Sequence, residues 1–90
     1  MACLLQTRDD VSKLVIGIFT AIFKRSDLTE NTSFTTDLGN PDAITRRAYY
    51  FIVKPAVVAE GCSAGKLSPD AFGKAETLGD IVDDVWHCVS

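Results

Sequence analysis

The chain has 90 residues, of which 47% are hydrophobic and 23% charged, and its formal net charge is -3 at pH 7. This length allows one domain with a modest core and leaves little room for a deep active-site cleft. We therefore expect a single domain over residues 1–90 that is not an enzyme. The acidic balance disfavours a nucleic-acid partner, and no run reaches the roughly 18 apolar residues of a membrane span.

The first segment carries clear helix signals. Thr7 and Asp10 stand at capping-box spacing, and apolar residues then recur with the helical period through position 23. The predicted face consists of Val11, Leu14, Val15, Ile18 and Ile22, widened by Phe19 and Phe23. Residues 26–40 are polar and predict a long loop, with Leu28, Phe34 and Leu38 as its apolar anchors.

A second helix is predicted to begin at residues 40–42, with Asn40 as the N-cap and Pro41 as the first helical residue. Its buried stripe is predicted to consist of Ile44, Ala48, Phe51 and Ile52. Pro55 has no N–H to donate and clashes with the preceding turn, so we expect the helix to stop or kink there.

Two further helices follow. Ser68 and Pro69 read as the cap and first residue of a short third helix, and Thr77 stands at capping-box spacing from Asp80 before a closing helix. The closing helix has the cleanest amphipathic pattern of the chain, with Leu78, Ile81, Val82, Val85, Trp86 and Val89 on one face. The sequence therefore predicts an all-α bundle of four helices, with a long loop after the first helix and a short third helix.

Three stretches occur in a fixed order: residues 33–39 (SFTTDLG), 67–70 (LSPD) and 77–82 (TLGDIV). Each resembles the entry to a helix in the acyl carrier protein family, and the first helix has a fitting length and distance ahead of them. The similarity covers roughly residues 11–89. It implies a four-helix acyl-carrier-like bundle.

In that family a serine shortly after the glycine receives phosphopantetheine, but Asp42 stands at that position here. Pro41 and Ala43 replace the residues on either side of the family's serine. A carboxylate cannot form the phosphodiester as an alcohol does. We therefore expect no phosphopantetheine. We also expect no other cofactor and no metal, since the sequence shows no metal-ligand pattern.

The second helix also differs in charge from the resembled family, whose second helix is usually acidic. It carries Arg46, Arg47 and Lys54, and an exposed tyrosine such as Tyr50 beside an arginine is a fair interface residue. Together with Asp42 these are the predicted partner-binding residues. Residues 55–66 form a longer connection to the third helix than is usual in the family. We expect only one of Tyr49 and Tyr50 to pack in the core.

The leading hypothesis is an acyl-carrier-like domain that acts by protein–protein interaction in or beside an acyl, lipid or secondary-metabolite pathway. The partner would be a protein, for instance an acyl-pathway enzyme. One alternative is a working acyl or aminoacyl carrier with phosphopantetheine on a displaced residue such as Thr45. A second alternative is an unrelated helical-bundle binding protein of the immunity type.

The cysteines Cys3, Cys62 and Cys88 are odd in number and show no Cys-x-x-Cys spacing. With His87 as the single histidine, a four-ligand zinc site is hard to assemble. We therefore expect reduced thiols in a cytoplasmic monomer.

Overall fold

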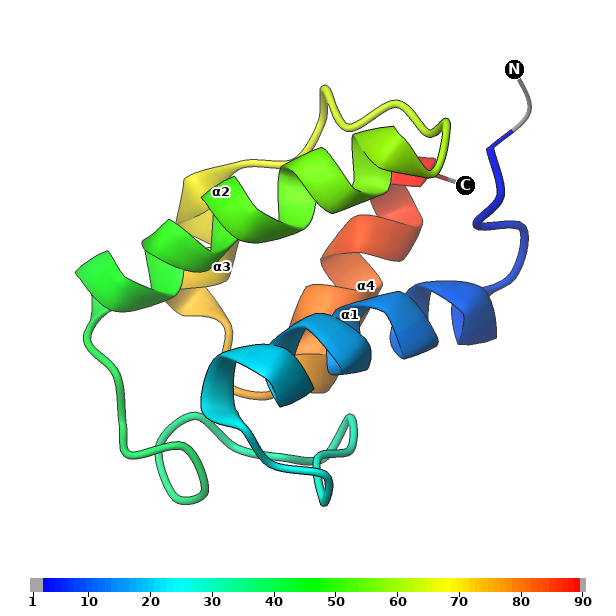
Figure 1. Cartoon of the computed structure of the whole chain (residues 1–90). Helices are drawn as coiled ribbons and strands as arrows, with labels where there is room; N and C mark the ends of the chain where they lie inside the picture. Colours follow the sequence, from blue (N-terminus) through cyan, green and yellow to red (C-terminus); the bar gives the residue numbers. More distant parts are fainter. Residues whose placement is uncertain (1–2, 90) are drawn as a thin grey trace.

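The computed structural model describes residues 3–89, which form four helices and no β-strand (Figure 1). Helix α1 spans Arg8–Phe23, α2 spans Ala43–Ala59, α3 spans Pro69–Lys74 and α4 spans Leu78–Val89. The prediction of an all-α fold with a long loop after the first helix and a short third helix is therefore confirmed.

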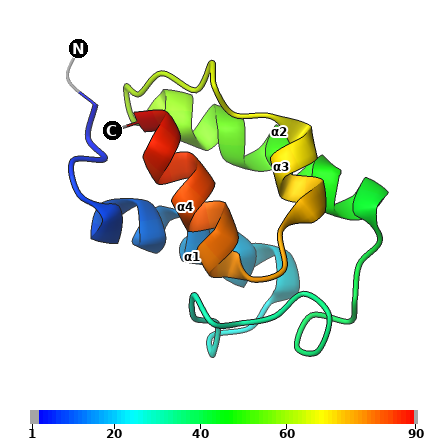
Figure 2. The same cartoon turned by 180° about the vertical axis from the view of Figure 1, so that it is seen from behind.

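The helices pack in two main pairs, α2 with α3 and α1 with α4. Helices α1 and α2 run in opposite directions, and α4 crosses one side of them, as the view from behind shows (Figure 2). All four helices and the long loop contribute to one core. Its largest fully buried side chains include Phe19, Phe34, Phe72, Leu78 and Ile81.

The predicted helix starts at positions 7, 68 and 77 are confirmed by hydrogen bonds. The Thr7 hydroxyl accepts from the backbone N–H of Asp10 at 3.2 Å, and the Asp10 carboxylate accepts from the N–H of Thr7 at 3.1 Å. Thr77 and Asp80 exchange the same pair of bonds at the start of α4. Ser68 caps α3, with Pro69 following it. Local side-chain chemistry decides these boundaries.

The long loop between α1 and α2 is held by its apolar anchors, since Leu28, Phe34 and Leu38 are buried as predicted. Its backbone is also tied to the turn before α4. The N–H of Phe34 donates to the carbonyl of Glu76 at 2.9 Å, and the N–H of Leu78 donates to the carbonyl of Thr32 at 3.1 Å. These bonds satisfy backbone groups that a loop of this length would otherwise expose.

The start of α2 lies later than predicted. Asp42, and not Asn40, is the N-cap, so Pro41 precedes the helix instead of opening it. Gly39 and Asn40 both adopt left-handed backbone angles, with φ of 77° and 52°. Asn tolerates this region better than most residues, and a left-handed residue cannot serve as the extended N-cap.

We predicted that the second helix stops or kinks at Pro55; it does not stop there, because α2 continues through this residue to Ala59. Residues 55–59 of the stretch 55–66, predicted to be a connection, are therefore helix. Val53 and Val57, two residues to either side of the proline, are fully buried. Their burial offsets the hydrogen bond that the proline cannot make.

The predicted buried stripe of α2 is also wrong. Exposed fractions are 78% for Ile44, 67% for Phe51 and 47% for Ile52, and Ala48 is exposed as well. The helix instead buries Tyr49, Tyr50, Val53 and Val57.

Both tyrosines of α2 pack in the core, contrary to the prediction that only one would. The ring of Tyr49 lies 5.0 Å from that of Phe19 and 6.0 Å from that of Phe34, between centroids. The ring of Tyr50 lies 6.0 Å from that of Phe72 in α3. Adjacent residues point about 100° apart on a helix. Both can be buried because α2 has neighbours on two sides.

Cys3 and Cys62 form a disulfide with their Cα atoms 4.5 Å apart, so the prediction of reduced thiols is wrong for this pair. The bond joins the N-terminal segment to the turn after α2, where the N–H of Leu4 also donates to the carbonyl of Glu60 at 2.9 Å. Sequence spacing could not reveal this pairing, since the two cysteines are 59 residues apart. Cys88 remains a half-buried free thiol.

Within residues 3–89 no helix has both the length and the apolar character that a membrane span requires.

Candidate functional site

Asp42, at the position of the resembled family's serine, holds the first turn of α2. Its carboxylate accepts a hydrogen bond from the backbone N–H of Thr45 at 2.7 Å. That backbone bond and a further one from the Thr45 hydroxyl lower the pKa of the Asp42 carboxyl below its ordinary value. The side chain is exposed but already serves as a cap, so its charge stabilises the helix start.

Arg46 is engaged inside the chain. Its guanidinium donates to the carbonyls of Pro41 at 2.9 Å and Ala75 at 3.0 Å, and to the Asn40 side chain at 3.2 Å. It also lies 5.4 Å from the ring centroid of Phe34. This half-buried arginine therefore joins the long loop, the start of α2 and the end of α3.

Arg47 and Lys54 place their charges at the surface along one edge of α2. Arg47 forms an ion pair with Asp70 of α3 at 3.3 Å, and both side chains are mostly exposed. Exposed pairs of this kind contribute little to stability. Lys54 Nζ donates to the hydroxyl of Tyr50 at 3.0 Å and lies 5.4 Å from its ring centroid. Of the five predicted partner-binding residues, Arg47 therefore has its charge in an exposed ion pair, and the half-buried Lys54 has its charge beside the buried ring of Tyr50.

The exposed apolar side of α2 is the feature that sequence reasoning missed. We define the α2 apolar face as the exposed residues Ile44, Ala48, Phe51, Ile52, Pro55, Val58 and Ala59. Four of the five large hydrophobic side chains exposed among the described residues belong to it. A face of this kind, bordered by polar side chains, is typical of an interaction surface. The available signal was that α2 carries a second apolar stripe, through Tyr49, Val53 and Val57.

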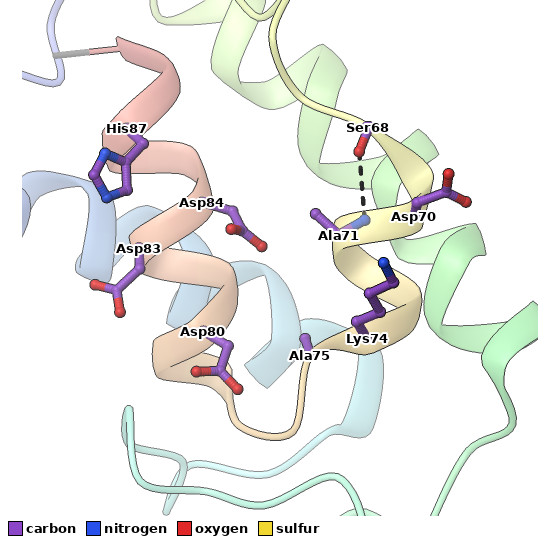
Figure 3. A pocket seen from close by; sticks show the side chains of 9 residues that line it. All are labelled: Ser68, Asp70, Ala71, Lys74, Ala75, Asp80, Asp83, Asp84 and His87. Atoms are coloured by element: carbon purple, nitrogen blue, oxygen red, sulfur yellow. Dashed lines mark hydrogen bonds between the residues drawn. The ribbon is translucent and has the colours of Figure 1, made fainter.

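A second surface feature is an acidic cleft of about 630 Å³ between α3 and α4 (Figure 3). Asp84 and Asp80 project from α4 beside it, while Ser68 and Lys74 line it from the side of α3. Burial, and then the charges of Asp80 and Asp83, raise the pKa of the Asp84 carboxyl. The cleft is wide and open, so it does not enclose a ligand.

The described residues contain no group of three or more His, Cys, Asp or Glu side chains that could hold a metal ion. In the same part of the chain, His87 is exposed at the rim of the cleft, and the neighbouring Cys88 thiol donates to the Ser63 carbonyl at 3.3 Å. The two side chains are therefore not arranged as a nucleophile and its base.

No family model, curated protein or solved structure matches this chain. The resemblance to acyl carrier proteins therefore stays a prediction that rests on the three short motifs and the order of the helices.

Proposed function

We propose that this chain is a protein-binding domain with acyl-carrier-like helix order that works without a phosphopantetheine arm. The α2 apolar face carries the proposal, because a helix that is packed on two sides still presents Ile44, Phe51 and Val58 to water. Exposed apolar side chains gathered on one helix face are typical of an interaction site. In this proposal the protein is not an enzyme, and it acts in or beside an acyl, lipid or secondary-metabolite pathway.

The start of α2 supports the absence of the arm. Asp42 offers a carboxylate where a carrier needs an alcohol, and that carboxylate caps the helix through Thr45. Thr45 itself is exposed in the first turn, which makes it the residue to inspect for a displaced attachment.

The Cys3–Cys62 disulfide is relevant to the cellular compartment in which the protein functions. Disulfides persist in oxidising compartments and are rare in the cytosol of ordinary cells. The expected cytoplasmic location depended on reduced cysteines, and that ground no longer holds. We propose that the protein functions where this bond stays oxidised. Alkylation of the native protein after unfolding without reductant should label one cysteine, whereas three labelled cysteines would contradict the proposal.

Intact-mass analysis after co-expression with a broad-specificity phosphopantetheinyl transferase tests the absence of the arm. We expect the unmodified mass, since the chain offers no alcohol at position 42. An Asp42→Ser variant measured in parallel shows whether the transferase can recognise this fold at all. A quantitative pantetheine-sized adduct on the wild-type protein, mapped for example to Thr45, would instead establish a working carrier.

Binding itself is tested in the native cell with a tagged full chain. We expect one protein to copurify with the wild type in constant stoichiometry and to be lost with Phe51→Ser, whose side chain is exposed and whose fold should be unchanged. Equal recovery with both chains would contradict a role for the α2 apolar face.

A further inference from the structure

The spacing within the α2 apolar face is that of a helix that packs lengthwise on another helix. Ile44, Ala48, Phe51, Pro55 and Val58 follow one another at intervals of four and three residues. This alternation is the a and d pattern by which two helices bury a common seam. Every one of these residues is exposed.

The two edges of this seam differ in charge. Arg47 and Lys54, seven residues apart, each directly precede a seam residue and lie along the edge nearest α3, where Arg47 meets Asp70. The other edge carries Thr45, Ile52 and Ala59, none of which is charged. A partner helix would therefore meet basic side chains on one side only.

A second copy of this chain does not complement the face. In a two-fold antiparallel pair the same edge of each helix meets its equivalent, so Arg47 and Lys54 would lie against the same two residues of the copy. A two-fold parallel pair would set the basic edge against the uncharged edge. The first arrangement is repulsive and the second gains nothing from charge. An anionic membrane surface is disfavoured because the seam offers only Arg47 and Lys54, and Arg47 is already paired with Asp70, whereas lipid-binding segments carry clusters of basic residues.

We propose that the α2 apolar face binds an amphipathic helix of a partner protein, whose apolar stripe is bordered by acidic side chains on the edge that meets Arg47 and Lys54. This inference rests on the proposed protein-binding function and names the chemistry of its partner. The absence of a phosphopantetheine arm is tested separately by intact mass, so either conclusion can fail without the other.

The probes are two synthetic three-heptad peptides with leucine at every a and d position. One carries glutamate and the other lysine at the flanking e and g positions. Fluorescence anisotropy should show that the full chain binds the glutamate peptide at least tenfold more tightly than the lysine peptide. Added salt should reduce this difference in affinity, because it screens exposed charges. The chain's net charge of -3 favours the lysine peptide, so a preference for glutamate must come from the local basic edge.

Three variants test which residues cause the preference for the glutamate peptide. Phe51→Ser should abolish binding of the glutamate peptide, and Lys54→Glu should remove most of its advantage over the lysine peptide. Lys13→Glu makes the same charge change at an exposed position of α1, where Lys13 pairs with Asp9 at 3.1 Å, and should leave the tenfold preference in place. Unchanged thermal unfolding of Phe51→Ser confirms that its loss of binding is not a loss of fold.

Several outcomes would overturn the proposal. These are equal affinity for the two labelled peptides, no binding of either peptide at a 100-fold molar excess of the protein, and equal loss of preference in Lys13→Glu and Lys54→Glu. Sedimentation that shows a dimer abolished by Phe51→Ser would assign the face to a second copy. Binding to phosphatidylcholine–phosphatidylglycerol vesicles in place of both peptides would assign it to a lipid surface.

Discussion

Helices α4 and α2 both carry a regular apolar stripe, yet the stripe of α4 is buried and the regular stripe of α2 is exposed. In α4, Leu78, Ile81 and Val85 are fully buried, and the remaining surface is marked by aspartates such as Asp83. In α2, the residues of the α2 apolar face, such as Ile44, are exposed to water, while Tyr49, Val53 and Val57 pack in the core. A helix with one apolar face has one favourable orientation, whereas a helix with two leaves the choice to its neighbours.

The same substitution in both helices tests whether the stripe of α4 is buried and that of α2 is exposed. Ile81→Ala removes a fully buried side chain from α4 and should lower the free energy of unfolding by about 2–5 kcal/mol. Ile44→Ala trims an exposed side chain of α2 and should change it by less than about 0.5 kcal/mol. Urea unfolding followed by circular dichroism measures both. Equal losses would mean that the α2 apolar face is buried in the free protein.

The end of α2 is also held differently from the end of α4, because the disulfide joins the turn after α2 to the N-terminal segment. Reduction, or replacement of both Cys3 and Cys62 by serine, should cost about 2–4 kcal/mol by freeing the unfolded chain. Cys88→Ser is the matched control and should leave stability nearly unchanged, since Cys88 is outside the disulfide. An unchanged urea midpoint after verified reduction would show that the bond is dispensable.

Replacing Pro55 measures how much a proline inside α2 lowers the free energy of unfolding. Pro55→Ala restores a helix-interior N–H at an exposed position and should raise the free energy of unfolding by about 1–3 kcal/mol. Pro69→Ala, at the first position of α3 where proline is well tolerated, should have little effect. Thermal and urea unfolding of the two variants side by side provide the measurement. A destabilised Pro55→Ala would show that the proline itself is required at this point of α2.

The smallest expected effect is a change in melting temperature when aspartates on the polar side of α4 are replaced. Because burial and the charges of Asp80 and Asp83 raise the pKa of Asp84, the folded state holds its proton more tightly than the unfolded state does. The ionised carboxylate therefore opposes folding at neutral pH. Asp84→Asn should raise the melting temperature slightly at pH 7, and the gain should vanish as the pH falls below the ordinary value of 3.8.

Asp83→Asn is the control for Asp84→Asn. It removes the 2.7 Å ion pair with Arg8 and should lower the melting temperature slightly at pH 7. Melting curves between pH 3 and pH 7 separate the two substitutions, and a lower melting temperature of Asp84→Asn at pH 7 would refute the assignment of Asp84.

Much of the architecture was predictable because its signals are local. The capping box of Thr7 with Asp10, the single apolar face of α4 and the buried loop anchor Phe34 all depend on residues close in sequence or on one clear period. The candidate site was predictable only in part. Arg47 and Lys54 were found by their charge, but the engagement of Arg46 depends on Ala75, distant in the chain.

By itself, the sequence determined the helix content, the polar loop, three of the helix starts and the carboxylate at position 42, since each follows from local propensity, capping or residue chemistry. Only the tertiary structure decided which side of α2 is buried, whether that helix continues past Pro55, and that Cys3 meets Cys62. These outcomes depend on contacts between α2, its neighbours and the N-terminal segment. No local pattern can rank two apolar faces of one helix when packing supplies the difference in free energy.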